Sequence, residues 1–326
     1  MPKRSSPRRP AHVPSLDRLF RCLALPALAV AIWRGQPRPA AAQVFVPHTV
    51  ELDPEQLESL GFELLQDADR WARFRQFGEA LPRAELASQL LPESAQVWAV
   101  LGSLYVQVDR YDDGIEALFK ARDIEPENAA ICFTIGSAFF QGADYAGAVE
   151  ELEAGLALMP NTPGALFDLG NAYFMLERFE RAIASYEEAF AQDGGFWPAL
   201  NNIGLVRYEQ GMTDRALGQW ESSTALAPEE AEPLLAQAAA LYARGDRDRS
   251  LALAEEAIVL DSRYTDLEFL KINLWGAQLL ADGEQLLADP RLQALQADVE
   301  QLLADPRLQA LLARTEPRAE PIFIRP

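Results

Sequence analysis

The chain has 326 residues, of which 29 are basic, 49 are acidic, two are cysteine and two are histidine. This length allows one or two domains, and a hydrophobic content of 49% is typical of a folded protein rather than a disordered one. Both histidines, His12 and His48, precede the repeats described below, so the body lacks the commonest general base and zinc ligand. These counts disfavour most enzyme mechanisms and any metal site built from cysteines.

The charge is unevenly distributed along the chain. Residues 1–42 hold eight basic residues and a single acidic one, Asp17. The rest of the chain keeps 21 basic and 48 acidic residues, which is a net charge of −27. A body this acidic repels phosphate backbones, so nucleic acid is disfavoured as a partner.

Residues 1–42 are predicted to be an export signal. A basic start precedes an uncharged run of twelve residues, 22–33, which is shorter than the roughly 20 residues that a membrane-spanning helix needs. Ala40-Ala41-Ala42 offers a cleavage site, so we expect a mature N-terminus at Gln43 in a periplasm or thylakoid lumen. Because three residues fit this pattern poorly, an uncleaved membrane anchor and a start codon assigned too early remain alternatives. These residues are Pro26, Arg34 and Arg38.

Residues 43–60 are predicted to be a linker followed by the start of the first helix. Asp53 is a typical N-cap residue, and Pro54 suits the first position of a helix because its missing N–H would be unpaired there in any case.

From here on, several residue types recur with one constant period, which is about 34 residues long. The recurring positions are Gly102, Gly136, Gly170 and Gly204; Ala148, Ala182 and Ala216; Pro92, Pro126, Pro160 and Pro228; and Trp71, Tyr105, Phe139 and Tyr173. Several registers that share one period indicate an array of repeated structural units.

Each unit is predicted to contain two helices. In 95–128, two apolar stripes with helical spacing are separated by the polar pair Asp109-Arg110, and Pro126 ends the second stripe. In later units Gly142, Gly211 and Gly245 mark the break between the helices. A glycine inside a helix costs roughly 1 kcal/mol relative to alanine. The glycine that recurs in each first helix therefore indicates a close approach of the second helix, with the recurring alanines facing it.

The spacing Trp98…Leu101-Gly102…Tyr105…Leu118…Ala121…Pro126 resembles the tetratricopeptide repeat. The resemblance covers six units, of which the first and last are degenerate because Ala68 and Ala238 replace the glycine. It implies an all-α, right-handed superhelical solenoid of antiparallel helix pairs with a concave groove. The predicted units are 61–94, 95–128, 129–162, 163–196, 197–230 and 231–264.

Residues 265–314 are predicted to form a capping helix and a duplicated helical segment. The sequence EQLLADPRLQAL occurs at 284–295 and again at 300–311, and Asp289-Pro290 and Asp305-Pro306 are typical helix starts. The duplication is either a tandem copy that adds a short helix or a second module for interaction or self-association. The capping helix, which contains Leu270 and Trp275, is expected to cover the last repeat. Residues 315–326 are predicted to be disordered.

No catalytic, cofactor-binding or metal-binding site is predicted. The sequence has no glycine-rich phosphate loop, nucleophile elbow or HExxH motif. Cys132 is expected to be a buried structural thiol, and Asp112-Asp113-Gly114 is expected to be a turn. Adjacent acidic pairs such as Glu187-Glu188 do not face each other on a helix, so they are expected to lie on solvated faces.

The resemblance also implies that the second, fifth, ninth and twelfth residues of each first helix line the groove. These positions, with Asn202 beside them, give a predicted peptide-binding set of Phe133, Phe140, Phe167, Asn171, Phe174, Asn201, Asn202, Tyr208 and Tyr242, among which lie Ser137, Leu205 and Leu235. Aromatic anchors with amides between them suit an extended or helical peptide that has apolar side chains. The two lysines after residue 42, Lys120 and Lys271, do not map to the groove, which disfavours a clamp for carboxylates. Alternatively, the aromatic residues pack against neighbouring helices.

Together these features predict an exported scaffold that binds a protein partner and supports the assembly or stability of an envelope or photosynthetic membrane complex. The task rests on analogy with the family. The alternatives are a regulatory subunit of an enzyme, an enzyme that uses carboxylates alone, and a structural protein that forms homo-oligomers through the duplicated segment.

Overall fold

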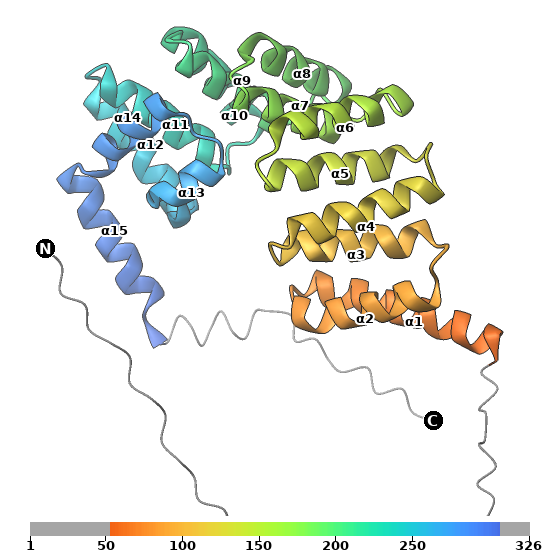
Figure 1. Cartoon of the computed structure of the whole chain (residues 1–326). Coiled ribbons are helices and arrows are strands. Elements are labelled where there is room, and N and C mark those ends of the chain that lie inside the picture. The colour runs from red at the N-terminus through yellow and green to blue at the C-terminus, as the bar shows by residue number, and fades with distance from the viewer. Residues whose placement is uncertain (1–52, 307–326) are drawn as a thin grey trace, which may run out of the picture. The chain divides into compact units, whose positions relative to one another are not determined.

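The structure is a computed structural model that describes residues 53–306. Within this range all regular structure is helical, comprising fifteen α-helices and one 3-10 helix, with no β-strand (Figure 1). The predicted fold class, an all-α solenoid of helix pairs, is confirmed. No helix in the described range is long and apolar enough to span a lipid bilayer. The predicted export signal and the tail from 315 onward lie outside the described residues.

Six helix pairs follow one another along the chain, and from Ala95 onward their first helices begin at a constant interval. The pairs are α1(Pro54–Arg73) with α2(Phe77–Leu90), α3(Ala95–Gln107) with α4(Tyr111–Ile124), α5(Ala129–Gln141) with α6(Tyr145–Leu158), α7(Pro163–Met175) with α8(Phe179–Gln192), α9(Trp197–Glu209) with α10(Thr213–Leu226), and α11(Ala231–Ala243) with α12(Arg247–Leu260). Each pair contacts the next, so the units stack in chain order.

Two predicted helix starts are confirmed. The Asp53 carboxylate accepts a hydrogen bond from the Glu55 amide at 3.1 Å, and Pro54 opens α1. Asp289 accepts from the Arg291 amide at 3.0 Å, and α15(Pro290–Leu303) begins directly after it. The helix expected after Asp305-Pro306 falls outside the described residues.

The turn inside each pair has one residue in the left-handed conformation, and these residues keep the period of the repeats. They are Arg75, Asp109, Ala143, Glu177, Gly211 and Gly245. Gly211 and Gly245 were expected to permit tight turning and do so. In the third unit Gly142 lies in the break between α5 and α6, as expected, but the left-handed residue is its neighbour Ala143 with φ 61°.

The recurring glycines have the packing role that their cost predicts. A Cβ added at Gly136 would lie 2.7 Å from Cγ of Leu152, and one added at Gly102 would lie 2.6 Å from Cγ of Leu118. At Gly170 and Gly204 the overlapping groups are the rings of Tyr186 and Trp220. These four large residues themselves recur with the same period on the second helices. The glycine therefore accommodates a large side chain, while the recurring alanines contribute close backbone approach, as with the Ala148 carbonyl 3.3 Å from the same Cβ at Gly136.

In the two degenerate units both residues of this contact differ: the one on the first helix is larger than glycine, and the one on the second helix is smaller. Where Ala68 and Ala238 replace the glycine, the facing residues of the second helices are Ala84 and Ala254. All four alanines are fully buried. The small alanine on the second helix leaves room for the Cβ of the alanine on the first helix, which allows the terminal units to pack without the glycine.

The chain after α12 forms a C-terminal arm, defined as residues 262–303. It contains η1(Ser262–Thr265), α13(Leu267–Ile272), α14(Ala277–Leu287) and α15(Pro290–Leu303). The capping helix was expected to cover the last repeat. Leu270 and Trp275 are buried in one cluster with Leu234 and Leu235 of α11, as this expectation requires. The structure also places α14 against α11 and α9, which are the first helices of the last two units, while α15 contacts α12 (Figure 1).

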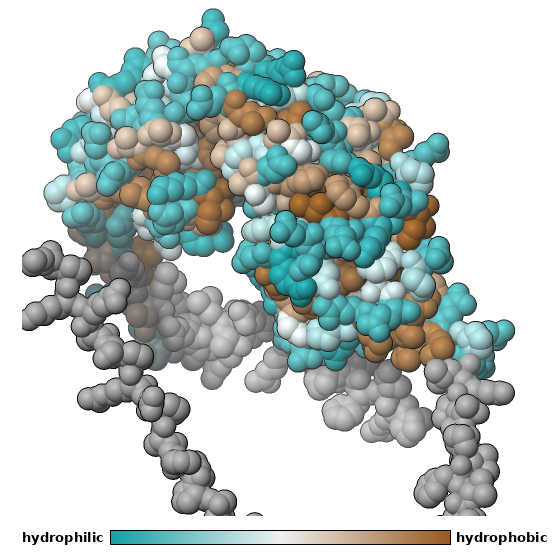
Figure 2. All heavy atoms as spheres, in the orientation of Figure 1, coloured by the Kyte–Doolittle hydropathy of each residue, from teal (hydrophilic) through white to brown (hydrophobic). Residues whose placement is uncertain are grey.

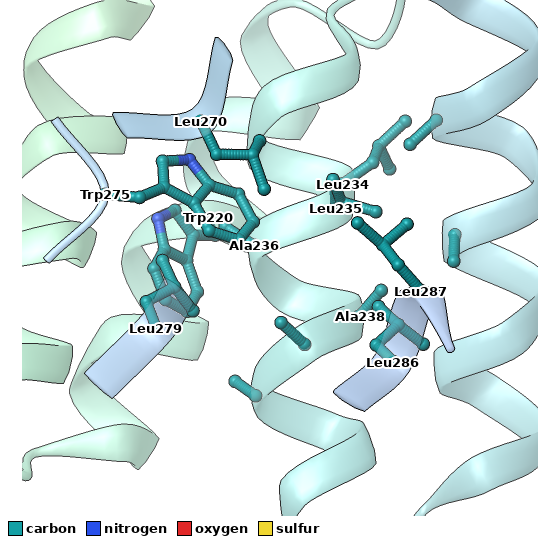
Figure 3. Packing of buried hydrophobic residues seen from close by; sticks show 14 of the residues in the cluster. Trp220, Leu234, Leu235, Ala236, Ala238, Leu270, Trp275, Leu279, Leu286 and Leu287 are labelled. Atoms are coloured by element: carbon teal, nitrogen blue, oxygen red, sulfur yellow. The ribbon is translucent and has the colours of Figure 1, made fainter. Parts of the chain in front are cut away.

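The C-terminal arm shares one hydrophobic core with the last two units. Leu270, Leu279 and Leu286 of the arm are fully buried in a cluster with Trp220 and Leu235. Figure 3 shows Leu279 beside the indole rings of Trp220 and Trp275, with Leu286 and Leu287 near Ala238. At about 1.5–3 kcal/mol for each large apolar side chain, this burial binds the arm firmly to the repeats.

A substitution of Gly136 by alanine tests the helix contact. We expect Gly136→Ala to lower the free energy of unfolding by about 1–3 kcal/mol, because the overlap with Leu152 outweighs the gain in helix propensity. Gly164→Ala is the control, since a Cβ there meets nothing within 4 Å. Adding Leu152→Ala recreates the alanine pair of the terminal units, so the two losses should be less than additive. Urea unfolding followed by circular dichroism measures the wild type, the three single variants and the double variant, and full additivity would contradict the proposed contact.

Candidate functional site

The surface formed by the first helices, α1, α3, α5, α7, α9 and α11, is here called the first-helix face. Consecutive members contact each other directly at α1–α3, α3–α5, α5–α7 and α9–α11. The predicted peptide-binding residues lie on these helices, but they differ in how far each is accessible. The first-helix face has three zones along the chain: an open pocket in the first two units, half-buried aromatic rings in the third and fourth, and the C-terminal arm in the last two.

In the third and fourth units, predicted anchors pack partly against their own chain. Phe133, Phe140 and Phe167 are half-buried. The Phe133 ring lies over Gly155 of α6, where an added Cβ would be 2.5 Å from the ring. Phe140 meets Tyr145 edge-on with 5.3 Å between centroids, and Phe167 meets Phe196 at 5.4 Å. These rings keep part of their surface free but are also structural.

Phe174 does not belong to an exposed strip. It is 8% exposed and packs against Phe179 with 6.0 Å between ring centroids. The expectation that Phe133, Phe140, Phe167 and Phe174 form one continuous apolar strip open to a ligand is therefore wrong at Phe174. Its ring is needed to close the turn between α7 and α8.

The predicted amides form an internal network. Asn171 accepts hydrogen bonds from the Tyr186 hydroxyl at 2.8 Å and from the Asn202 amide at 2.9 Å. Asn201 donates to Asn202 at 3.2 Å. Asn201 is 0% exposed and Asn202 is buried, so the expectation that they bind a peptide backbone is corrected: they join α7, α8 and α9. Asn171 remains half-buried.

In the last two units the C-terminal arm occupies the first-helix face. The Tyr208 hydroxyl donates to Asp282 of α14 at 2.7 Å, and the Tyr242 hydroxyl donates to Asp289 at 3.2 Å. Arg247 donates to the same Asp289 carboxylate at 2.5 Å and lowers its pKa. Tyr208 is 1% exposed, and Leu205 and Leu235 beside it are buried. These predicted groove residues do contact a peptide segment, but the segment belongs to the chain itself.

Glu209 fixes the start of α14 on this face. Its carboxylate accepts hydrogen bonds from the amides of Gln278 at 3.2 Å and Leu279 at 3.0 Å, which are unpaired donors at a helix N-terminus. The close approach requires a glycine at 276, because any Cβ there would overlap the Glu209 side chain. Sequence reasoning did not identify Glu209, since its partner lies 70 residues away.

Glu232 is a second carboxylate that the arm covers. It accepts hydrogen bonds from Trp275 Nε1 at 3.3 Å and from the Tyr264 hydroxyl at 3.4 Å. Burial raises its pKa to about 7. Burial also raises the pKa of Asp168 on α7 to about 6. Neither carboxylate belongs to the predicted site, and both lie on first helices, where the surrounding apolar packing disfavours charge.

The first two units contain an open pocket that the sequence analysis did not predict. It has a volume of about 510 Å³ and lies between the end of α1 and the inner side of α3. Its lining is mostly apolar, with Arg73 and Arg75 among its polar members. The lining includes Asp69, Ala72, Phe77, Gln96, Ala99, Val100, Ser103 and Leu104.

The pocket exists because no aromatic ring occupies the groove positions of these units that line it. Asp69 and Ala72 are the ninth and twelfth residues of the first unit, and Gln96, Ala99 and Ser103 are the second, fifth and ninth of the second. The same positions carry Phe133, Phe140 and Phe167 further along, where rings fill the space. In the region of α1 to α4, the visible surface shows hydrophobic patches between hydrophilic residues (Figure 2).

The described residues contain no cluster of metal-binding side chains. No group of three or more His, Cys, Asp or Glu side chains within 53–306 is placed to hold a metal ion. Cys132 is buried, as predicted, and burial raises the pKa of its thiol.

A family profile described as the tetratricopeptide repeat matches residues 133–195, which span most of the third and fourth units. The chain contains tetratricopeptide repeats. The helix pairs on either side keep the same period and the same glycine contacts, so the repeats extend beyond the matched residues. A search of curated proteins finds no match to the sequence.

Solved structures support the fold. PilF from Pseudomonas aeruginosa aligns with a TM-score of 0.54 at 15% identity, over 67% of this chain and 99% of that chain. MamA from Desulfovibrio magneticus RS-1 aligns at 0.48 with 18% identity, over 52% and 94% of the two chains. YrrB, described as a TPR protein with an unusual peptide-binding site, aligns at 0.46 with 19% identity, over 59% and 95%. At these identities the likeness concerns the fold alone.

The raised pKa of Glu232 predicts a pH-dependent stability. The ordinary pKa of a glutamate is 4.5, so between pH 4.5 and about 7 the folded chain holds a proton that the unfolded chain has released. This residue's contribution to stability therefore falls as the pH rises through that window. The free energy of unfolding of the Glu232→Gln variant, relative to that of the wild type, should therefore rise by about 1–3 kcal/mol between pH 5 and pH 8.

Urea unfolding at each pH measures this difference. The exposed Glu229→Gln is the matched control, because it removes a nearby carboxylate without touching the C-terminal arm. A difference between Glu232→Gln and the wild type that stays constant with pH would show that the Glu232 carboxyl is not held in its uncharged form.

Proposed function

We propose that this chain is a non-catalytic scaffold that binds a protein or peptide partner in the pocket between α1 and α3. The observation that carries the proposal is this pocket, about 510 Å³ in volume, at groove positions of the repeats. The remaining length of the first-helix face is filled by aromatic side chains or by the C-terminal arm. A mostly apolar hollow with a few polar groups at its edge is the usual form of a binding site.

The pocket lining defines the chemistry of the ligand. Its apolar part, which includes Phe77, Val100 and Leu104, suits one or two large aliphatic or aromatic side chains. Arg73 pairs with Asp69 at 2.6 Å, whereas Arg75 has no ion pair within residues 53–306. At physiological salt, charges beyond about 8 Å are largely screened, so the local arginines outweigh the acidic body. The preferred ligand therefore combines apolar anchors with an acidic side chain.

We further infer that the partner continues from the pocket over the third and fourth units. Phe133, Phe140, Phe167 and Asn171 remain half-buried there and keep free surface on the same first-helix face. Partly exposed rings at repeat positions five and twelve are suitable secondary anchors. The contact zone would thus run along the face until it meets the C-terminal arm.

The proposed location is outside the cytoplasm, in a periplasm or thylakoid lumen, and the proposed task is to support the assembly or stability of an envelope or photosynthetic membrane complex. The support for this part is the basic start, the twelve-residue apolar run and the Ala40-Ala41-Ala42 site. Retention of the N-terminal segment as an anchor would place the same repeats at the membrane surface.

Filling the pocket tests the binding proposal. A peptide library displayed on phage is selected on residues 43–326, and the selected peptides should combine large apolar residues with Asp or Glu. Ala99→Trp should weaken their binding at least about tenfold, because the indole occupies the volume that the anchors need. Ala184→Trp, at an exposed position of α8, is the control for surface changes. Peptides that bind both variants equally well would place the ligand elsewhere.

Processing of the N-terminus tests the location. We expect mass spectrometry of the protein purified from its native cells to find a new N-terminus at Gln43. An intact N-terminus on membrane-bound protein would support the anchor instead. A reporter fused to residues 1–50 that stays in the cytoplasm would contradict both forms of the proposal.

A further inference from the structure

The duplicated segment supplies two identical peptides, and the structure shows how one of them binds. The first dodecamer is residues 284–295, and the second dodecamer is residues 300–311. The surface of α11 and α12 that the first dodecamer contacts is here called the arm site. Because the two dodecamers have the same sequence, whatever the arm site recognises in the first is also present in the second.

The first dodecamer engages the arm site with most of its distinctive side chains. Leu286, Leu287 and Leu292 are buried in the core shared with the last two units. Asp289 accepts hydrogen bonds from Tyr242 and Arg247. Arg291 pairs with Glu255 of α12, with Nη2 at 2.8 Å from the carboxylate. The arm site therefore contacts leucines, an aspartate and an arginine that follow one another in a fixed order along the dodecamer.

The second dodecamer begins at the end of α15, beyond the arm site. Leu302, which corresponds to Leu286, is 62% exposed, whereas Leu286 is 0% exposed. Exposed leucine in a helix is a modest cost by itself. Its significance here is that it belongs to a complete copy of a segment that packs against the arm site.

The residues before each dodecamer are also alike. Leu295 and Asp298 stand before the second dodecamer at the places of Leu279 and Asp282 before the first. The difference is Val299 in place of Gly283. A Cβ at Gly283 would lie 3.0 Å from the Trp275 ring, so a valine there fits only if the ring moves slightly. This contact favours the first dodecamer as the resident of the arm site within one chain.

We propose that the second dodecamer binds the arm site of a second copy of this chain, where it displaces the resident first dodecamer. In this exchange α13 and Trp275 stay in place on each chain, and the 24 residues from 276 to 299 connect the two molecules. Extended, such a segment reaches up to roughly 80 Å, which is enough to join two bodies of this size. Only eight residues, 276–283, separate Trp275 from the first dodecamer, which restricts that copy to its own chain.

The exchange leaves the number of occupied arm sites unchanged. The dodecamer contacts are therefore equal in number in the monomer and the exchanged dimer, whereas the contacts of residues 276–283, such as Glu209 with the Leu279 amide, favour the monomer. Raising the protein concentration shifts the balance toward the dimer. A substitution that weakens the binding of the first dodecamer to the arm site must favour exchange. The same substitution in the second dodecamer must oppose exchange. Two identical segments make this a strictly matched comparison.

A cross-linking experiment with two tagged populations tests the proposal in the chain of residues 43–326 with Cys132→Ala. One population carries Glu255→Cys and the other carries Arg307→Cys, the counterpart of Arg291. A short bis-maleimide is used, since an arginine–glutamate pair spans more than a disulfide. We expect a cross-linked species that contains both tags, with a yield that rises with concentration. Glu255→Cys with Arg291→Cys in one chain is the positive control for the geometry.

Leu286→Ala and Leu302→Ala then give opposite results. Leu286→Ala should raise the two-tag yield several-fold, and Leu302→Ala should lower it at least about tenfold, because a buried leucine is a large part of the contact. Circular dichroism checks that both variants stay helical. Equal effects of the two variants would overturn the proposal. So would a cross-link between Glu255→Cys and Arg307→Cys that forms only within one chain, independently of concentration, because this would show a shift of register instead of exchange.

Discussion

The close approach of two helices within each unit is the constraint on which the rest of this structure depends. A glycine of the first helix accommodates a large side chain of the second, as at Gly136 with Leu152 and Gly204 with Trp220. This contact sets the distance between the helices of a pair, and because it recurs once in each repeat, it gives successive units the same shape. Units of the same shape stack in one direction, so equivalent residues of successive first helices come to lie along one face.

The fold could be predicted from the sequence because its determinants are local and periodic. Helix boundaries, turn residues and the glycine contacts all lie within one unit, and each is repeated several times. The C-terminal arm could not be predicted in the same way. Its position depends on single long-range contacts, such as Glu209 with the Leu279 amide across 70 residues, that no other part of the chain repeats. The capping contacts of Leu270 and Trp275 were expected there, but the sequence offered no sign that α14 would also cover the first-helix face.

The candidate site shows why a search for large side chains is insufficient. The predicted set named the most conspicuous groove residues, and the structure finds several of them occupied: Asn201 and Asn202 join helices, Phe174 closes a turn, and Tyr208 holds the arm. The open pocket lies where Ala72, Ala99 and Ser103 leave space. A hollow follows from what surrounds small residues, and this information is three-dimensional. The periodic numbering of groove positions, applied to small residues as well as to large ones, would have pointed to these units.

The docking of the C-terminal arm also gives the solenoid a direction of unfolding. In a simple array, each unit contacts only its neighbours, so both ends fray and the interior is the most stable part. Here the arm joins the fifth and sixth units through Tyr208, Tyr242 and a shared core, which makes them one cooperative block. Within the described residues, no comparable arm joins the first unit to its neighbour. Loss of structure should therefore start at α1 and α2, beside the open pocket, so the region proposed to bind a partner is also the one whose order the partner would most increase.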